Sequence, residues 1–142
     1  MVVNAKTLRL ITETCPDEEV LDGGPAKCKA LDRRHFELLE EVLGGVAAVR
    51  AFAKSQGGGA VNFMEADWAA TESSLWYVNY NAGRTVRWAW SDVRVVVDTG
   101  SSMFGSSRRI TVRTDQGADE LSLGRQAAKS LLRIAGTKVA PA

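Results

Sequence analysis

The sequence predicts an α+β domain in which short antiparallel strands lie between two amphipathic helices. Apolar residues recur with the helical period of about 3.6 in residues 32–43 and again in residues 125–135. Between them the pattern alternates with the strand period, and turn residues interrupt it at short intervals. A single domain accounts for the whole pattern, because a chain of 142 residues can bury about two thirds of its unfolded surface.

The first 31 residues are predicted to be a helical appendage to a domain that spans residues 32–142. Apolar residues at positions 8–11 fit either a short helix or a strand, and several Pro and Gly residues then interrupt the pattern. Asp32 is a candidate N-cap for the leading helix of residues 32–43, and Gly44 is expected to end it.

Seven strands are expected after this helix. In the fourth, Val86, Trp88 and Trp90 share one face, and in the fifth, Val93, Val95 and Val97 do the same. Gly83 closes a hairpin turn between the third and fourth strands. The expected strands are residues 46–55, 60–71, 74–80, 84–90, 93–98 and 108–114, followed by one that carries Leu121 and Leu123.

The closing helix of residues 125–135 has an apolar stripe that is expected to pack on the sheet. Its members are spaced i, i+3, i+4 and i+7, and basic residues lie outside the stripe. The stripe consists of Ala128, Leu131, Leu132 and Ala135.

Charge excludes some classes of partner. Eighteen Lys and Arg against seventeen Asp and Glu leave a net charge of +1, which provides no global field for nucleic acid, so no nucleic-acid partner is expected. Cys15 and Cys28 lack the spacing of a zinc motif, and His35 is the one histidine, so neither a metal nor a cofactor is expected. We expect reduced cysteines, His35 on the exposed side of its helix and a cytoplasmic location.

The order of elements and several local motifs resemble the short bacterial pleckstrin-homology-like and GRAM-like domains. The motifs are Trp90-Ser91-Asp92-Val93, then Met103-Phe104-Gly105, then Ile110 to Thr114, and finally Ala128, Leu131 and Leu132. The resemblance covers roughly Leu38 to Gly136 and departs at Thr71 to Leu75, where such domains carry a basic turn. It implies a bent antiparallel sandwich or partly open barrel of seven strands with a C-terminal capping helix. It also implies a non-enzymatic binding or adaptor module.

The resemblance directs attention to basic residues that would bind a lipid headgroup. Relatives that bind phosphoinositides use Lys and Arg between the first two strands, and here that loop offers only Lys54. One cation holds a multiply charged phosphate poorly, so we expect weak membrane binding. The remaining basic candidates are Arg84, Arg87, Arg108 and Arg109.

Aromatic residues offer a protein-binding alternative. Seven of the ten aromatics fall between positions 63 and 90, so some must face away from the core of the sandwich. Trp76 or Tyr77 is a candidate anchor for a protein partner or a second subunit. The alternative is that both faces of these strands are buried because the N-terminal appendage covers the outer one.

One motif favours an enzyme. Three valines followed by Asp98-Thr99-Gly100 resemble the active-site strand and turn of aspartic proteases. That chemistry needs two carboxylates that share a proton, so a chain with one motif would have to act as a homodimer. Only 44 residues follow Asp98, too few for the flap and closing strand of such a fold, so we prefer the binding module.

Overall fold

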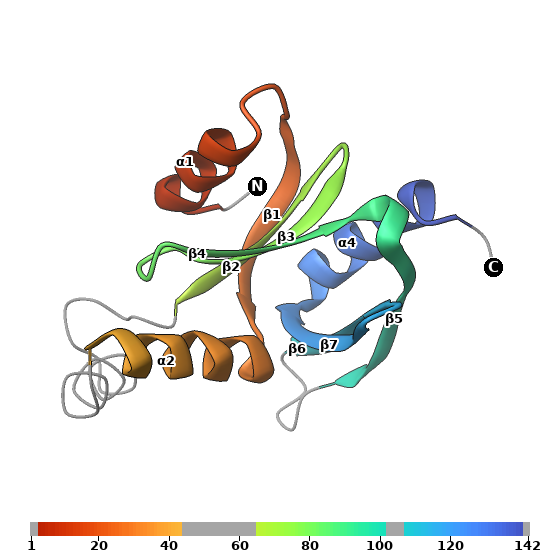
Figure 1. Ribbon diagram of the computed structural model, residues 1–142. Coiled ribbons are helices and arrows are strands. Elements are labelled where there is room, and N and C mark those ends of the chain that lie inside the picture. The colour runs from red at the N-terminus through yellow and green to blue at the C-terminus, as the bar shows by residue number, and fades with distance from the viewer. Residues whose placement is uncertain (1–2, 44–64, 102–106, 141–142) are drawn as a thin grey trace.

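The structure is a computed structural model that describes residues 3–43, 65–101 and 107–140 (Figure 1). Helices and strands follow one another as in the sequence prediction from Ser74 onward, and differ from it before that point. The elements are α1 (Ala5–Thr14), β1 (Val20–Lys27), α2 (Lys29–Leu43), β2 (Ala66–Thr71), β3 (Ser74–Asn79), β4 (Arg84–Ala89), the 3-10 turn η1 (Trp90–Asp92), β5 (Val93–Ser101), β6 (Ser107–Thr114), β7 (Gly117–Gly124) and α4 (Arg125–Lys138).

The strands form one bent, open antiparallel sheet in the order β4-β3-β2-β1-β7-β6-β5. Tight turns join β2 to β3, β3 to β4 and β6 to β7, and Gly83 and Gly117 supply the positive φ angles of the last two turns. Figure 1 shows α4 against the half of the sheet formed by β5, β6 and β7, and α1 beside the other half. The expected α+β class, with seven antiparallel strands in an open sheet and a closing helix, is confirmed.

The N-terminal segment corrects the prediction of an appendage. Residues 20–27 form β1, the middle strand of the sheet, which pairs with β2 over six positions and with β7 over two. The expected first strand, residues 46–55, lies outside the described residues, as does the start of the second, whose later part is β2. The seven strands are therefore counted from β1.

Glycine and proline signals concealed β1 in the sequence. A Cβ atom at Gly23 would come within 2.6 Å of the Trp68 carbonyl oxygen, so only glycine permits this approach of β1 to β2. Pro25 lies opposite Asp67 of β2, and β7 pairs only with the two residues after it. At Pro25 the side of β1 toward β7 is therefore unpaired, and a residue without an N–H is tolerated there.

Two cores lie on opposite faces of β2 and β3. The main core joins the sheet to α4 and to the start of α2, and it includes Trp68, Tyr77 and Leu131. Of the predicted α4 stripe, Ala128, Leu131 and Ala135 are buried and Leu132 is partly buried. The smaller core lies under α1 and consists of Ile11, Ala69, Trp76 and Val78.

Candidate functional site

Trp76 and Tyr77 are both fully buried, with no exposed side-chain surface. The prediction that one of them is an exposed anchor is therefore wrong. Trp76 packs against Ile11 of α1 in the smaller core, and its indole N–H donates to Thr71 Oγ1 at 3.1 Å. The alternative in the sequence analysis, that the N-terminal segment covers the outer face, is what the structure shows.

Tyr77 is the centre of a buried polar network that ties α2 to the sheet. Its hydroxyl accepts the backbone N–H of Cys28 at 2.9 Å and donates to Asp32 Oδ1 at 2.9 Å. Asn79 donates to the same Asp32 oxygen at 3.0 Å and bonds to His35 Nδ1. Asp32 therefore does not cap α2, which begins three residues earlier at Lys29, but accepts bonds from β3 instead.

Burial decides the protonation of this network. Removal from water raises the pKa of the Tyr77 hydroxyl and of the Cys28 thiol, and it lowers the pKa of the His35 imidazole. The prediction of an exposed His35 is wrong, because the side of α2 that carries it packs against Asn79. A buried thiol whose pKa is raised is held protonated, which is a structural state rather than that of an activated nucleophile.

The basic residues of β4 have different roles. The Arg87 guanidinium lies 5.1 Å from the centre of the Trp76 ring, and its Nε donates to Ser74 Oγ at 2.7 Å. Its Nη2 also lies 4.0 Å from a Glu18 carboxylate oxygen. Arg87 therefore binds the chain before β1 to the β3–β4 hairpin. Arg84 is exposed at the opposite end of the same strand.

Asp98 and Arg108 form a bidentate ion pair near one end of the β5–β6 ladder. Arg108 Nε and Nη2 donate to the two carboxylate oxygens at 2.8 and 2.9 Å, and the Gly100 N–H donates to Asp98 Oδ1 at 2.9 Å. Arg108 and this N–H hold the pKa of Asp98 below its usual value. The carboxylate is consequently kept ionised.

A cavity of about 470 Å³ lies between this ion pair and the first turns of α4. Its lining combines three cations with one carboxylate and an apolar floor. The lining residues are Asp98, Arg108, Arg125, Gln126, Ala128, Lys129 and Leu132. Arg109 follows Arg108 in β6 and is exposed on the other face of the sheet.

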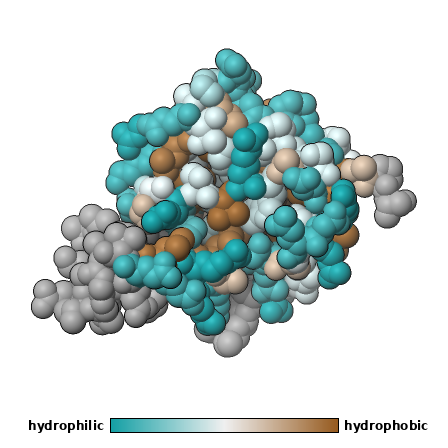
Figure 2. Space-filling model, viewed as in Figure 1, coloured by the Kyte–Doolittle hydropathy of each residue, from teal (hydrophilic) through white to brown (hydrophobic). Residues whose placement is uncertain are grey.

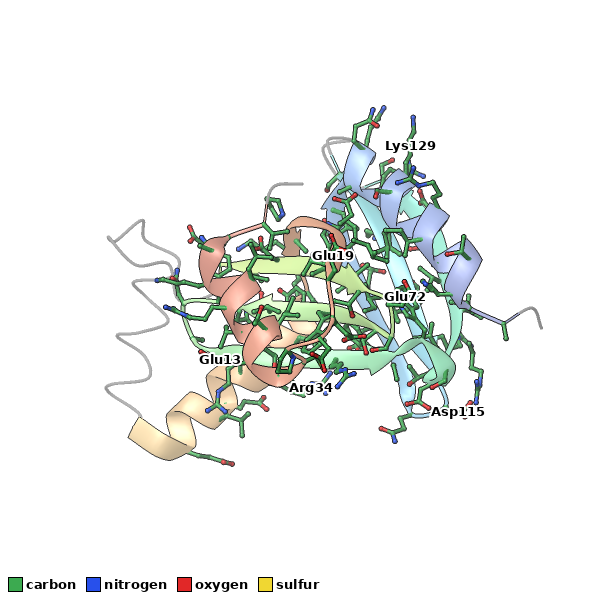
Figure 3. The ribbon with its side chains drawn as sticks, turned by 90° about the horizontal axis from the view of Figure 1, so that it is seen from above. Glu13, Glu19, Arg34, Glu72, Asp115 and Lys129 are labelled. Atoms are coloured by element: carbon green, nitrogen blue, oxygen red, sulfur yellow. The ribbon has the colours of Figure 1, made fainter. Side chains whose placement is uncertain are left out.

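The predicted basic residues do not converge on one site. Arg84 and Arg87 belong to β4 at one edge of the sheet, and Arg108 lies on β6 next to the opposite edge. In Figure 3 two other cations are labelled apart from each other, Lys129 of α4 toward the top of the view and Arg34 of α2 below its centre. Lys54 lies outside the described residues.

The exposed edge of β5 is a feature that the sequence analysis missed. Val95 is 41% exposed and Val97 is 44% exposed, whereas Val93 is buried. The expected common face for these three valines is wrong, because the pairing register with β6 shifts between Val93 and Val95. Such a bulge moves every later side chain to the other face of the sheet. Three successive valines at 95–97, apolar on both faces, were the available signal.

The β5 edge carries two exposed apolar side chains on one strand. In the face shown in Figure 2, apolar areas are small and are separated by hydrophilic side chains. Among the described residues, four large hydrophobic side chains are exposed, and two of them are Val95 and Val97. β5 ends the strand order of the sheet, so one side of its backbone has no partner strand among these residues.

The described part of the chain also bears on metal binding and on membrane insertion. There, no group of three His, Cys, Asp or Glu side chains is placed to hold a metal ion. Cys15 and Cys28 are free thiols. No helix within residues 3–43, 65–101 and 107–140 has the length and apolar character needed to cross a membrane.

Comparison with known proteins identifies a structural relative and no family. No family model matches the chain, and no curated protein matches it. The structure is similar to the crystal structure of the C-terminal domain of an unknown protein from Leishmania infantum, with a TM-score of 0.56 and 13% sequence identity. The match covers 92% of this chain and 93% of that chain, so the two share a fold over nearly their whole length.

Proposed function

We propose that this chain is a non-enzymatic binding module, similar to pleckstrin-homology-like domains, that acts through contacts with other proteins. The observation that carries the proposal is the β5 edge, where two exposed valines adjoin a strand backbone that has no partner on one side among the described residues. Proteins blunt such edges with Lys, Pro or an inward charge, because an open edge pairs readily with another strand. Residues 95–97 contain none of these, and the register shifts of β5, which also blunt an edge, lie on either side of this segment.

Binding by strand addition explains both properties of β5. Main-chain hydrogen bonds to an added strand provide affinity, and side chains at alternate positions provide selectivity. Val95 and Val97 occupy such alternate positions on the outer face of the sheet. On the neighbouring strand β6 they lie opposite Arg113 and Thr111, which supply a polar rim.

The geometry gives less support to the aspartic-protease alternative. The two aspartates of such a protease hold one proton between them, so the facing carboxylate oxygens must be free to approach each other. Arg108 occupies both oxygens of Asp98 and lowers its pKa. Asp98 is therefore better explained as the structural partner of Arg108.

A lipid-headgroup module is also less well supported. The cavity beside α4 contains Arg108, Arg125 and Lys129, which is the largest gathering of cations around a described cavity. However, Arg108 is already bound to Asp98 through two donors, and the lining includes that carboxylate. We therefore expect only weak, headgroup-independent binding to acidic vesicles.

The reducing cytoplasm is the proposed location, which the two free thiols support.

The proposal is tested by capture from a lysate of the native host with three matched baits. These are the wild-type chain, Val97→Lys, and Leu21→Lys as the control, because Leu21 is equally exposed at 44% but lies on β1. Proteins captured by β5 should be retained by wild type and by Leu21→Lys and lost with Val97→Lys. Equal capture by all three baits would remove β5 from the proposal.

A further inference from the structure

The edge strand β5 has a segment whose sequence is complementary to itself. The pairing of β5 with β6 has two register shifts, one between Val93 and Val95 near its beginning and one between Asp98 and Gly100 near its end. The regular segment between them runs from Val95 to Asp98, and Arg94 precedes it. From this segment we infer that β5 pairs antiparallel with β5 of a second copy of this chain, with Val96 on the two-fold axis. The inference rests on the proposed function, because it names the partner of the same edge.

The outer face of the sheet determines this register. When two identical strands pair about a two-fold axis through Val96, Val95 of each copy lies directly opposite Val97 of the other. Both side chains are on the outer face and more than 40% exposed, so the pairing covers all four valines at once. Moving the axis to Val97 places Val95 opposite Thr99, which lies at the second register shift. That arrangement leaves the outer valines without apolar partners.

Charge is complementary in the same register. With Val96 on the axis, Arg94 of one copy lies opposite Asp98 of the other, and the relationship repeats on the second side of the axis. Parallel pairing of two β5 strands would instead place Arg94 beside Arg94, which is destabilising. The two-fold antiparallel register therefore brings together opposite charges and avoids like charges.

Intramolecular bonds hold both charges in place. Asp115 accepts from Arg94 Nε and Nη2 at 3.1 and 2.9 Å, and Arg94 Nη1 donates to the Ser91 carbonyl at 3.0 Å. Asp98 is held by Arg108 in the same bidentate manner. Because these four side chains are already ordered, pairing of two copies costs little additional side-chain entropy at the ends of the segment.

The size of the contact predicts a weak dimer. A regular segment of four residues, with one neighbouring row of side chains, falls well below the roughly 1,200–2,000 Å² of a stable protein interface. We therefore expect monomers at low concentration and dimers only as the protein is concentrated. Val95 and Val97 provide the apolar centre, and Arg94 and Asp98 provide the rim.

The first test measures association by sedimentation equilibrium over a wide concentration range. Wild type and Leu21→Lys are expected to dimerise with the same dissociation constant, and Val97→Lys is expected to weaken it at least tenfold because an edge lysine blocks strand pairing. A monomer at all concentrations would overturn the inference, as would a dimer that Val97→Lys leaves intact. Matching thermal midpoints for the three proteins show that each is folded.

The second test reads the register and does not depend on the lysine variant. In a Cys15→Ser background, Val95→Cys and Val97→Cys proteins are prepared separately and then mixed under mild oxidation. Directly opposite residues have Cα atoms about 4.5–5.5 Å apart, which a disulfide bridges, whereas diagonal positions lie beyond about 7 Å. We expect disulfides mainly between the two different variants. Disulfides formed equally well within each variant would overturn the proposed axis.

Failure of this inference is distinguishable from failure of the proposed function. A chain that remains monomeric but loses captured host proteins with Val97→Lys would retain a binding edge for a different partner. If the chain dimerises through β5 and captures no other protein, the edge serves self-association alone. A monomer whose captured proteins are unchanged by Val97→Lys would refute both.

Discussion

Removing the Tyr77 hydroxyl should destabilise the fold more than its one-atom size suggests. Tyr77→Phe leaves the buried Cys28 N–H without its acceptor, a loss of about 1–3 kcal/mol. It also removes a bond to the Asp32 carboxylate, which keeps its bond from Asn79. We expect a total loss of about 2–4 kcal/mol, a large part of the roughly 5–15 kcal/mol that stabilises a typical domain.

Urea unfolding measures this loss, with Tyr80→Phe as the matched control. The Tyr80 hydroxyl also donates to a carboxylate, Glu65 Oε2 at 3.0 Å, but Tyr80 is only partly buried and water can replace the bond. The control should therefore lose less than about 1 kcal/mol. With an m value of about 2 kcal/mol/M, the unfolding midpoint of Tyr77→Phe should fall by about 1–2 M.

Amide exchange tests the mechanism separately from the magnitude. If Tyr77 protects the Cys28 N–H, the amide of Cys28 should exchange faster in Tyr77→Phe. The amide of Leu131 is the reference, and its exchange rate should change only as far as global stability changes. Equal stability of the two Phe variants, with Cys28 exchange unchanged, would refute the view that this hydroxyl ties α2 to the sheet.

The remaining predictions concern the closing helix and pH. Leu131→Ala should cost about 2–5 kcal/mol in denaturant unfolding, because Leu131 is fully buried between α4 and the sheet; a variant as stable as wild type would make α4 peripheral. Burial lowers the pKa of His35 in the folded chain, so the unfolded chain binds a proton first as the pH falls. Stability should therefore decrease below about pH 6.5, by up to about 1.4 kcal/mol per pH unit, until His35 also titrates in the folded chain. A His35→Gln variant should lose this part of the slope, and an unchanged pH profile would contradict the assignment.

Local patterns predicted the second half of the chain well. The turn at Gly83 and the stripe of α4 depend on residues close together in the sequence, and each lies where it was expected. In contrast, Gly23 and Pro25 mark turns by local rules, but the close approach of Trp68 and the short pairing with β7 allow them inside a central strand. That information depends on residues far along the chain.

The candidate site was less predictable for the same reason. Alternation placed Trp76 and Tyr77 on opposite faces of one strand, which is correct. Alternation does not indicate that α1 covers the face of Trp76, nor that α2 is bonded to Tyr77 on the other face. The alternation of β5 predicted the wrong faces because the register shift after Val93 is a property of its pairing with β6. The valines at 95–97 indicate apolar side chains on both faces, but which of them are exposed depends on that pairing.

The position of β1 has a consequence for how the protein is made. β1 lies near the start of the chain and pairs with β7, the last strand, through Ala26 and Leu123. During synthesis, β2, β3 and β4 can pair with one another and with β1 as they emerge, but the second side of β1 stays open until the ribosome has released β7. Contacts between distant parts of a chain form slowly, and strands that are still unpaired are prone to aggregate. Before β7 emerges, the two-residue pairing that joins the halves of the sheet cannot form. The growing chain is thus most prone to aggregate during this interval.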